Sequence, residues 1–106
     1  MINFDDFKKI ELKTAKVIDV KDHPGADKLY IVTVDLGDEK KDVVAGVKNF
    51  YTPDELKGKT VVVVTNLEPA VIRGVESSGM ILAATSGDML SVVGLDKDLP
   101  AGVTVK

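Results

Sequence analysis

The chain has 106 residues, of which 44% are apolar and 29% are charged, and this size and composition suit one globular domain with a single core. Its net charge of -3 excludes a surface that is basic throughout, so any polyanion must bind to a local basic patch. With no cysteine and one histidine, the chain cannot form disulfides, thiolate nucleophiles, sulfur-ligated zinc sites or histidine-rich metal sites.

Alternating side chains predict a long first strand over residues 11–20, whose apolar face changes along its length. Residues 22–27 have the composition of a turn, and a second strand is expected over residues 28–36. One face of this second strand carries four apolar side chains: Tyr30, Val32, Val34 and Leu36. A glycine and an aspartate then turn the chain into a third strand near residues 41–46.

The only helix that we expect begins after Thr52, which has the character of an N-cap. Pro53 occupies the first helical position, and Glu55 follows the cap by three residues, as in a capping box. Gly58 stands where a helix would stop, so the predicted helix is one turn long or slightly more.

Two further strands are predicted, over residues 59–65 and 79–85. Three strands, a short helix and two strands in about 85 residues indicate an all-β protein with a five-stranded oligonucleotide/oligosaccharide-binding (OB-fold) barrel. Residues 86–106 form a C-terminal extension with two extra strands, over residues 89–93 and 103–105. These strands can cover a barrel edge or pair with a second chain.

Five segments, taken in order, resemble the tRNA-binding domain family: residues 11–17, 23–30, 34–37, 44–47 and 66–80. This family includes the C-terminal domain of many methionyl-tRNA synthetases, free-standing tRNA-binding proteins and the export-related chaperone CsaA. The resemblance covers nearly the whole chain, so residues 1–106 are interpreted as one domain. The resemblance implies a barrel that recognises tRNA by shape, and it implies that stand-alone members form homodimers. A chain that starts at Met1 and ends about 20 residues past the barrel is expected to be a stand-alone member.

The resemblance also implies a set of tRNA-binding residues: Lys28, Lys48, Asn66, Arg73, Ser77 and Met80. Lys28 and Arg73 would bind phosphates, the second through its planar fork. Asn66 and Ser77 would bond sugar or base edges, and the Met80 thioether would contact a base or ribose. Lys48 lies in the loop that also holds two stacking candidates, Phe50 and Tyr51.

Three positions depart from the family pattern. Ala45 replaces a frequent serine, while Glu68 and Val71 stand where lysines are common. Since salt dependence scales with the number of phosphates neutralised, the loss of the two cations predicts weaker RNA binding with a flatter salt dependence. Most site residues also have a structural interpretation: Asn66 can hold a turn, Ser77 can cap one, and Met80 can belong to the core. Arg73 can be an exposed loop cation, and Lys28 a solvated strand end.

Enzymatic functions have little support, because the sole histidine, His23, precedes a proline in a turn and is interpreted as fixing that turn. No glycine-rich phosphate loop precedes a helix, and we expect no cofactor and no metal. Two functions remain open: a tRNA-binding module that assists methionyl-tRNA synthetase in cis or in trans, which we favour, and a chaperone-like homodimer that binds peptides. No membrane span or signal peptide is evident, so a cytoplasmic location is expected.

Overall fold

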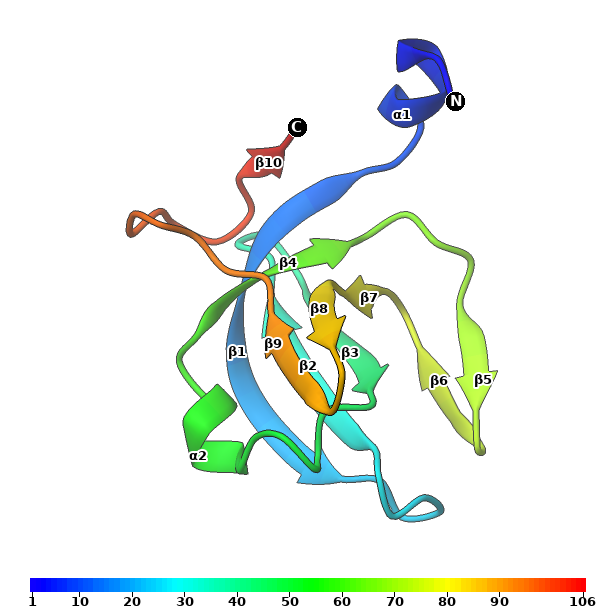
Figure 1. Cartoon of the computed structure of the whole chain (residues 1–106), viewed down its shortest axis with the longest axis vertical. Coiled ribbons are helices and arrows are strands. Elements are labelled where there is room, and N and C mark those ends of the chain that lie inside the picture. Colours follow the sequence, from blue (N-terminus) through cyan, green and yellow to red (C-terminus); the bar gives the residue numbers. More distant parts are fainter.

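The computed structural model describes all 106 residues and consists mainly of β-strands (Figure 1). Strand β1 (Leu12–Asp22) lies at the centre of the main sheet and pairs with β2 (Tyr30–Asp35) and β4 (Thr60–Val64). Strand β3 (Lys40–Ala45) pairs with β2, and β7 (Met80–Ile81) pairs with β4. All four pairings are antiparallel, so the sheet has the order β3–β2–β1–β4–β7.

The two outer strands of this sheet approach each other and nearly close it into a barrel. The Ser78 N–H donates to the Asp42 carbonyl at 3.0 Å, and the Val44 N–H donates to Ser77 Oγ at 2.9 Å. These bonds join β3 to the segment just before β7. The predicted five-stranded barrel is therefore confirmed, with a short helix between its third and fourth strands.

The barrel core is built mostly from valine side chains of β1 to β4, which suit a pleated and buried surface. The predicted apolar face of β2 is confirmed, since all four of its residues are buried. In β1 the pairing with β2 shifts between Val17 and Asp19, as in a β-bulge. Thr14 and Ala15 are both buried, as are Val17 and Val20, so the buried face of β1 changes along the strand as predicted.

Helix α2 (Pro53–Leu56) is the predicted helix, and its capping box is present. Thr52 Oγ1 accepts from the Glu55 N–H at 3.2 Å, and Glu55 Oε1 accepts from the Thr52 N–H at 2.8 Å. The bond from the Thr52 N–H to the Glu55 carboxylate is the main reason why the pKa of Glu55 lies below its ordinary value, and the Thr52 hydroxyl lowers it further. Leu56 is buried and anchors the helix, which ends before Gly58 at a φ of 87°.

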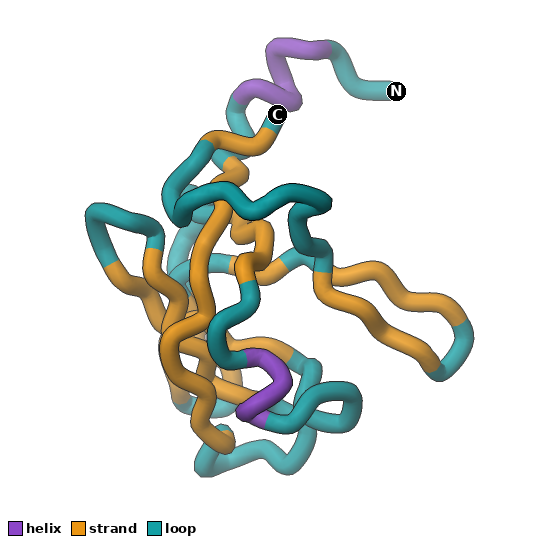
Figure 2. The backbone as a smooth tube through the Cα atoms, turned by 90° about the vertical axis from the view of Figure 1, so that its left-hand side faces the viewer, coloured by secondary structure: helices purple, strands orange, loops and turns teal.

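The expectation of a single helix is wrong, because a second helix, α1 (Phe4–Lys8), precedes β1. Asn3 caps it, with its Oδ1 accepting from the Asp6 N–H at 2.9 Å. A helix of five residues is too short for an apolar periodicity to show in the sequence. In Figure 2 this helix lies at one end of the molecule, beside both chain termini. Neither helix has the length and apolar character that crossing a membrane requires.

The predicted strand over residues 79–85 is interrupted at Leu82. The Leu82 N–H donates to the Val62 carbonyl at 2.9 Å, and its own carbonyl accepts from the Val93 N–H at 2.9 Å. The chain therefore changes partners at this residue. It leaves the barrel and continues as β8 (Ala83–Ser86), which forms a hairpin with β9 (Met89–Val92).

Both strands predicted in the C-terminal extension are present, as β9 and β10 (Thr104–Val105). Strand β10 pairs antiparallel with the start of β1, so this strand pairs within the chain. The buried Thr14 hydroxyl supports the pairing, since it donates to the Pro100 carbonyl at 2.8 Å and accepts from the Val103 N–H at 2.9 Å.

Candidate nucleic-acid interface

A β-hairpin that the sequence analysis did not predict carries the first candidate cation. Strands β5 (Ala70–Ile72) and β6 (Val75–Ser77) are joined by a two-residue turn, Arg73–Gly74, at which φ is 53° and 88°. Positive φ at both positions is typical of a type I′ turn, which favours asparagine and glycine. A left-handed arginine is strained by a free energy on the order of 1 kcal/mol. The turn nevertheless presents the exposed Arg73 side chain at the tip of the hairpin.

The predicted turn after β1 packs against this hairpin tip through His23. The imidazole is 4% exposed, and its Nδ1 accepts a hydrogen bond from the Gly25 N–H at 2.9 Å. Its Nε2 lies 2.9 Å from the Ile72 carbonyl oxygen on the hairpin. His23 therefore fixes its own turn, as interpreted from the sequence, and also joins that turn to β5.

Lys28 and Arg73 lie together at this junction. They line a shallow hollow whose other lining residues are Ala26, Asp27 and Leu29. Neither cation has a carboxylate oxygen within 4.0 Å, whereas five other lysines in the structure form ion pairs. Asp27 shares the hollow but forms no ion pair with either cation, so both side chains have donors available for a phosphate.

Lys48 lies at the same end of the barrel but is engaged by an acid. Its Nζ is 3.2 Å from Asp22 Oδ1, at the end of β1, and its side chain is about 31% exposed. Of the two stacking candidates nearby, Phe50 is 41% exposed. Tyr51 has a structural role, since its hydroxyl accepts from the Val92 N–H at 3.0 Å and so supports the β8–β9 hairpin.

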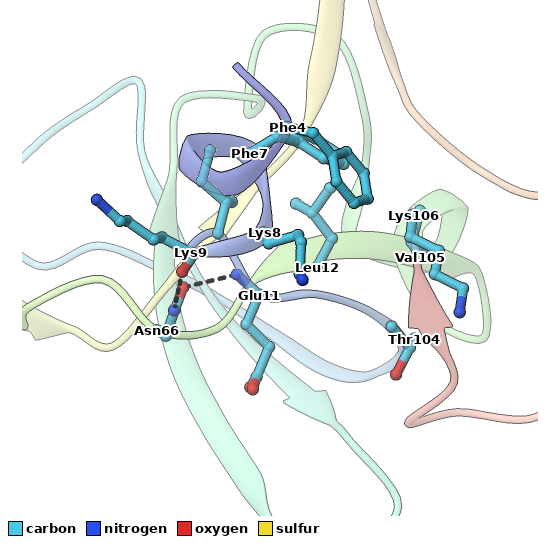
Figure 3. A pocket seen from close by; sticks show the side chains of 11 residues that line it. Phe4, Phe7, Lys8, Lys9, Glu11, Leu12, Asn66, Thr104, Val105 and Lys106 are labelled. Atoms are coloured by element: carbon cyan, nitrogen blue, oxygen red, sulfur yellow. Dashed lines mark hydrogen bonds between the residues drawn. The ribbon is translucent and has the colours of Figure 1, made fainter. Parts of the chain in front are cut away.

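Asn66 is placed away from Lys28 and Arg73. Figure 3 shows its amide between Lys9 and Glu11, in the segment that joins α1 to β1. Its Nδ2 donates to the Lys9 carbonyl at 2.7 Å, and its Oδ1 accepts from the Glu11 N–H at 2.9 Å. This arrangement supports the structural interpretation of Asn66, because one amide hydrogen and one lone pair of Oδ1 are already used within the protein.

The last two predicted residues differ in exposure. Ser77 is 4% exposed, and its hydroxyl accepts from the Val44 N–H and donates to the Gly79 carbonyl at 3.1 Å. It therefore holds the hairpin base. Met80 is 47% exposed and stands opposite Val64 in the β7–β4 pair, so its thioether is accessible. The structure thus brings Lys28, Arg73 and Lys48 to one end and leaves the other three elsewhere.

Sequence analysis missed two lysines that lie beside the hairpin base. Lys40 and Lys41, at the start of β3, line a polar hollow with Glu76 and Ser78 from the hairpin side. Lys41 Nζ donates to the Thr65 carbonyl at 2.9 Å, so Lys40 is the freer cation. Two adjacent lysines at the start of a predicted strand were a visible signal, but their proximity to residues 76–78 depends on barrel closure.

The three departures from the family pattern also have distinct positions. Ala45 is 8% exposed at the end of β3, opposite Tyr30. Val71 is 73% exposed on the hairpin, and Glu68 is exposed just before it. The hairpin therefore presents one cation at its tip and an acid near its base.

No group of three or more histidine or acidic side chains able to hold a metal is present.

A five-stranded antiparallel barrel with a helix between its third and fourth strands defines the OB-like class of small binding modules. The family described as "Putative tRNA binding domain" matches residues 12–104. The chain therefore belongs to the tRNA-binding domain family, as the sequence segments indicated.

Three known proteins illustrate this kinship. The methionine–tRNA ligase of Pyrococcus abyssi is 51% identical over 105 residues, which make up 99% of this chain and 14% of that protein. The solved structure of a MetRS related protein from Pyrococcus horikoshii superposes with a TM-score of 0.92 at 31% identity, covering 100% of this chain and 98% of that one. The CsaA chaperone protein from Picrophilus torridus also gives a TM-score of 0.92, at 30% identity, with all of both chains covered.

Proposed function

We propose that this protein is a non-catalytic tRNA-binding module that acts in the cytoplasm. The observation that carries the proposal is the pair of unneutralised cations, Lys28 and Arg73, on two loops that meet at one end of the barrel. Arg73 can bind a phosphate through two parallel N–H groups, and Lys28 can add a second, mobile contact. With a net charge of -3 the surface as a whole does not attract RNA, so binding requires a local site of this kind.

Recognition by shape is the form of binding that this surface supports. Contacts to phosphates set position and orientation but carry no base information. Two cations on a small rigid platform match a defined spacing of phosphates, such as that at a bend of folded RNA, better than a particular sequence. The exposed Met80 and Phe50 side chains provide apolar surface for an unstacked base or a ribose.

We further propose that the module assists methionyl-tRNA synthetase, in cis or in trans. The likeness to a methionine–tRNA ligase supports this role, although the chain spans only 14% of that protein's length. A module that binds tRNA weakly raises the local tRNA concentration at a catalytic unit to which it is joined or bound. Weak binding is sufficient for this purpose, so the loss of cations at Glu68 and Val71 is compatible with it.

The proposed oligomeric state is a homodimer that buries the apolar surface around α1. Ile2 and Phe4 are 69% and 70% exposed, and Ile10 is 45% exposed, so three large apolar side chains lie at one end of the chain. Exposed apolar clusters of this kind commonly mark interfaces. Strand β10, from the extension 86–106, pairs with the start of β1 and lies beside α1, so it belongs to the same surface. Sedimentation velocity of the parent and of Phe4→Asp tests this, with a monomeric parent as the opposing result.

The second candidate function is the binding of peptides in a chaperone-like manner. A hollow of about 420 Å³ between α1, β1 and β10 favours it, since its lining includes Phe4, Phe7, Ile10 and Val105. If peptides bind there, a labelled apolar peptide will bind to the parent with little salt dependence. The Phe7→Ser variant will bind the same peptide more weakly. We favour tRNA binding, because the same surface serves equally well as the dimer interface.

The test of the main proposal is the binding of total tRNA across a salt series, followed by fluorescence anisotropy. Each phosphate contact contributes about -0.7 to -0.9 to the slope of log K against log salt. Arg73→Ala should weaken binding and reduce the magnitude of the slope by roughly one contact. Lys97→Ala is the matched control, because Lys97 is an exposed cation in the loop before β10 and should leave the slope unchanged. An absence of binding by the parent at low salt would refute the proposal.

A further inference from the structure

The two loops that carry Lys28 and Arg73 are far apart in the sequence, and they meet at one buried side chain. His23 Nε2 lies 2.9 Å from the Ile72 carbonyl oxygen, which can only accept, so Nε2 carries the ring proton. Nδ1 accepts from the Gly25 N–H and therefore has no proton. The bonding thus assigns one neutral tautomer to His23, and both ring nitrogens are already used inside the protein.

The contact between the two loops extends to the backbone of Arg73 itself. A Cβ placed on Gly25 would lie 3.3 Å from the Arg73 carbonyl oxygen and 3.4 Å from His23 Cε1. The first distance is shorter than an ordinary van der Waals contact, so an alanine at position 25 would press on the backbone of Arg73, and glycine favours the close approach of the two loops. The imidazole and the backbone of Gly25 together form one joint beneath the turn that presents Arg73.

Without this joint the hairpin would be attached to the barrel only at its base. The other hydrogen bonds between the hairpin and the barrel are those of Ser77 with Val44 and of Ser78 with Asp42. Both lie at the end of the hairpin opposite the turn. The bond to Ile72 is therefore the only hydrogen bond that holds the tip in place relative to Lys28.

We propose that His23 is a positioning residue for RNA: by joining the turn after β1 to the hairpin, it fixes Lys28 and Arg73 as one pair of phosphate contacts. This rests on the proposed tRNA-binding function. A pair held in place loses less conformational freedom on binding than two independent side chains on mobile loops, and its affinity is correspondingly higher. His23 itself does not touch the RNA.

Two substitutions separate the two bonds of the imidazole. In His23→Asn the Oδ1 atom occupies the place of Nδ1 and can keep the bond from Gly25, but the shorter side chain cannot reach Ile72. In His23→Gln the Nε2 atom can still donate to Ile72, while the acceptor for Gly25 is lost. Since one hydrogen bond contributes about 0.5–1.5 kcal/mol, or a factor of roughly 2–12, His23→Asn should weaken tRNA binding about 3- to 10-fold. His23→Gln should retain affinity within about 2-fold.

A double-mutant cycle distinguishes positioning from a general structural effect. If His23 acts through the hairpin tip, Arg73→Ala will weaken binding much less in the His23→Asn background than in the parent, because the contact is already impaired. If His23 only stabilises the fold, the two effects will multiply. Gly25→Ala disturbs the same joint without changing the imidazole, and it should also weaken tRNA binding. It replaces the His23 variants in the test if these fold poorly.

The measurements are tRNA anisotropy at fixed low salt and backbone relaxation at Arg73 and Gly74 without RNA. We expect greater mobility of both amides in His23→Asn than in His23→Gln. Suppose that the parent binds tRNA and that Arg73→Ala weakens this binding as expected. Full tRNA affinity of His23→Asn would then overturn this inference and leave the proposed function standing. No binding of tRNA by the parent would overturn the proposed function and this inference with it.

Discussion

Replacing Asn66 by alanine should destabilise the protein rather than its RNA complex. The substitution removes two hydrogen bonds, of 2.7 Å to the Lys9 carbonyl and 2.9 Å from the Glu11 N–H. Each neutral bond contributes about 0.5–1.5 kcal/mol net, so the expected loss is about 1–3 kcal/mol. For a domain of this size that corresponds to a fall in Tm of roughly 4–8 °C for each kcal/mol. Asn49→Ala is the control, because the exposed Asn49 side chain makes no hydrogen bond.

Urea unfolding and amide hydrogen exchange measure the two parts of this effect. The Glu11 amide loses its acceptor in Asn66→Ala, so its exchange should accelerate, while amides in the middle of β1 change only with global stability. Well below the melting temperature, tRNA affinity and its salt slope should equal those of the parent. Unchanged stability and exchange, combined with a clear loss of tRNA affinity, would refute the structural role and restore the RNA contact expected from the sequence.

Three further substitutions test the framework of the barrel. Thr14→Val should cost about 2 kcal/mol in urea unfolding, since it leaves the backbone N–H and carbonyl that bond the hydroxyl without partners; stability equal to the parent would contradict this. Gly79→Ala should cost about 1–3 kcal/mol, because the added Cβ would lie 2.9 Å from the Val64 carbonyl oxygen; a parent-like Tm would show that the barrel yields there. The pKa of Glu55 is lowered by its bonds to Thr52, so its stabilising contribution is present above the unfolded pKa and is lost as the pH falls through the folded one. A carboxyl NMR titration of the parent and of Thr52→Ala checks the share of the hydroxyl: the variant keeps the backbone N–H that donates to Glu55, so its pKa should rise only part of the way to the ordinary value, and an equal pKa in both proteins would argue against a contribution from the Thr52 hydroxyl.

The barrel was predictable because its strands carry strong local signals. Alternation in β2 and the run of valines in β4 define which side chains are buried. The capping box of α2 is visible as Thr52 and Glu55 at the right spacing. These patterns involve neighbours in the sequence, and the order of strands then follows from the small number of ways to close a short sheet.

The site was less predictable because it depends on contacts between remote segments. The family resemblance implied RNA contacts for Asn66 and Ser77, with a structural role as the alternative, and their bonds to residues 33 to 57 positions away support that alternative. The β5–β6 hairpin was missed because Arg73 occupies a turn position that usually signals itself by asparagine. The link from His23 to Ile72 spans 49 residues, and no local pattern announces it.

The pairing of β10 with the start of β1 brings the two chain termini to the same end of the molecule. In Figure 1 both termini lie beside α1 at the top, whereas the tip of the β5–β6 hairpin points toward the opposite, lower end. A fluorophore, an affinity tag or a fused protein attached at either terminus would therefore leave the Arg73 tip unobstructed. A short peptide that joins the two ends would yield a circular permutant, opened in the loop of residues 95–102, in which the cation pair keeps its place.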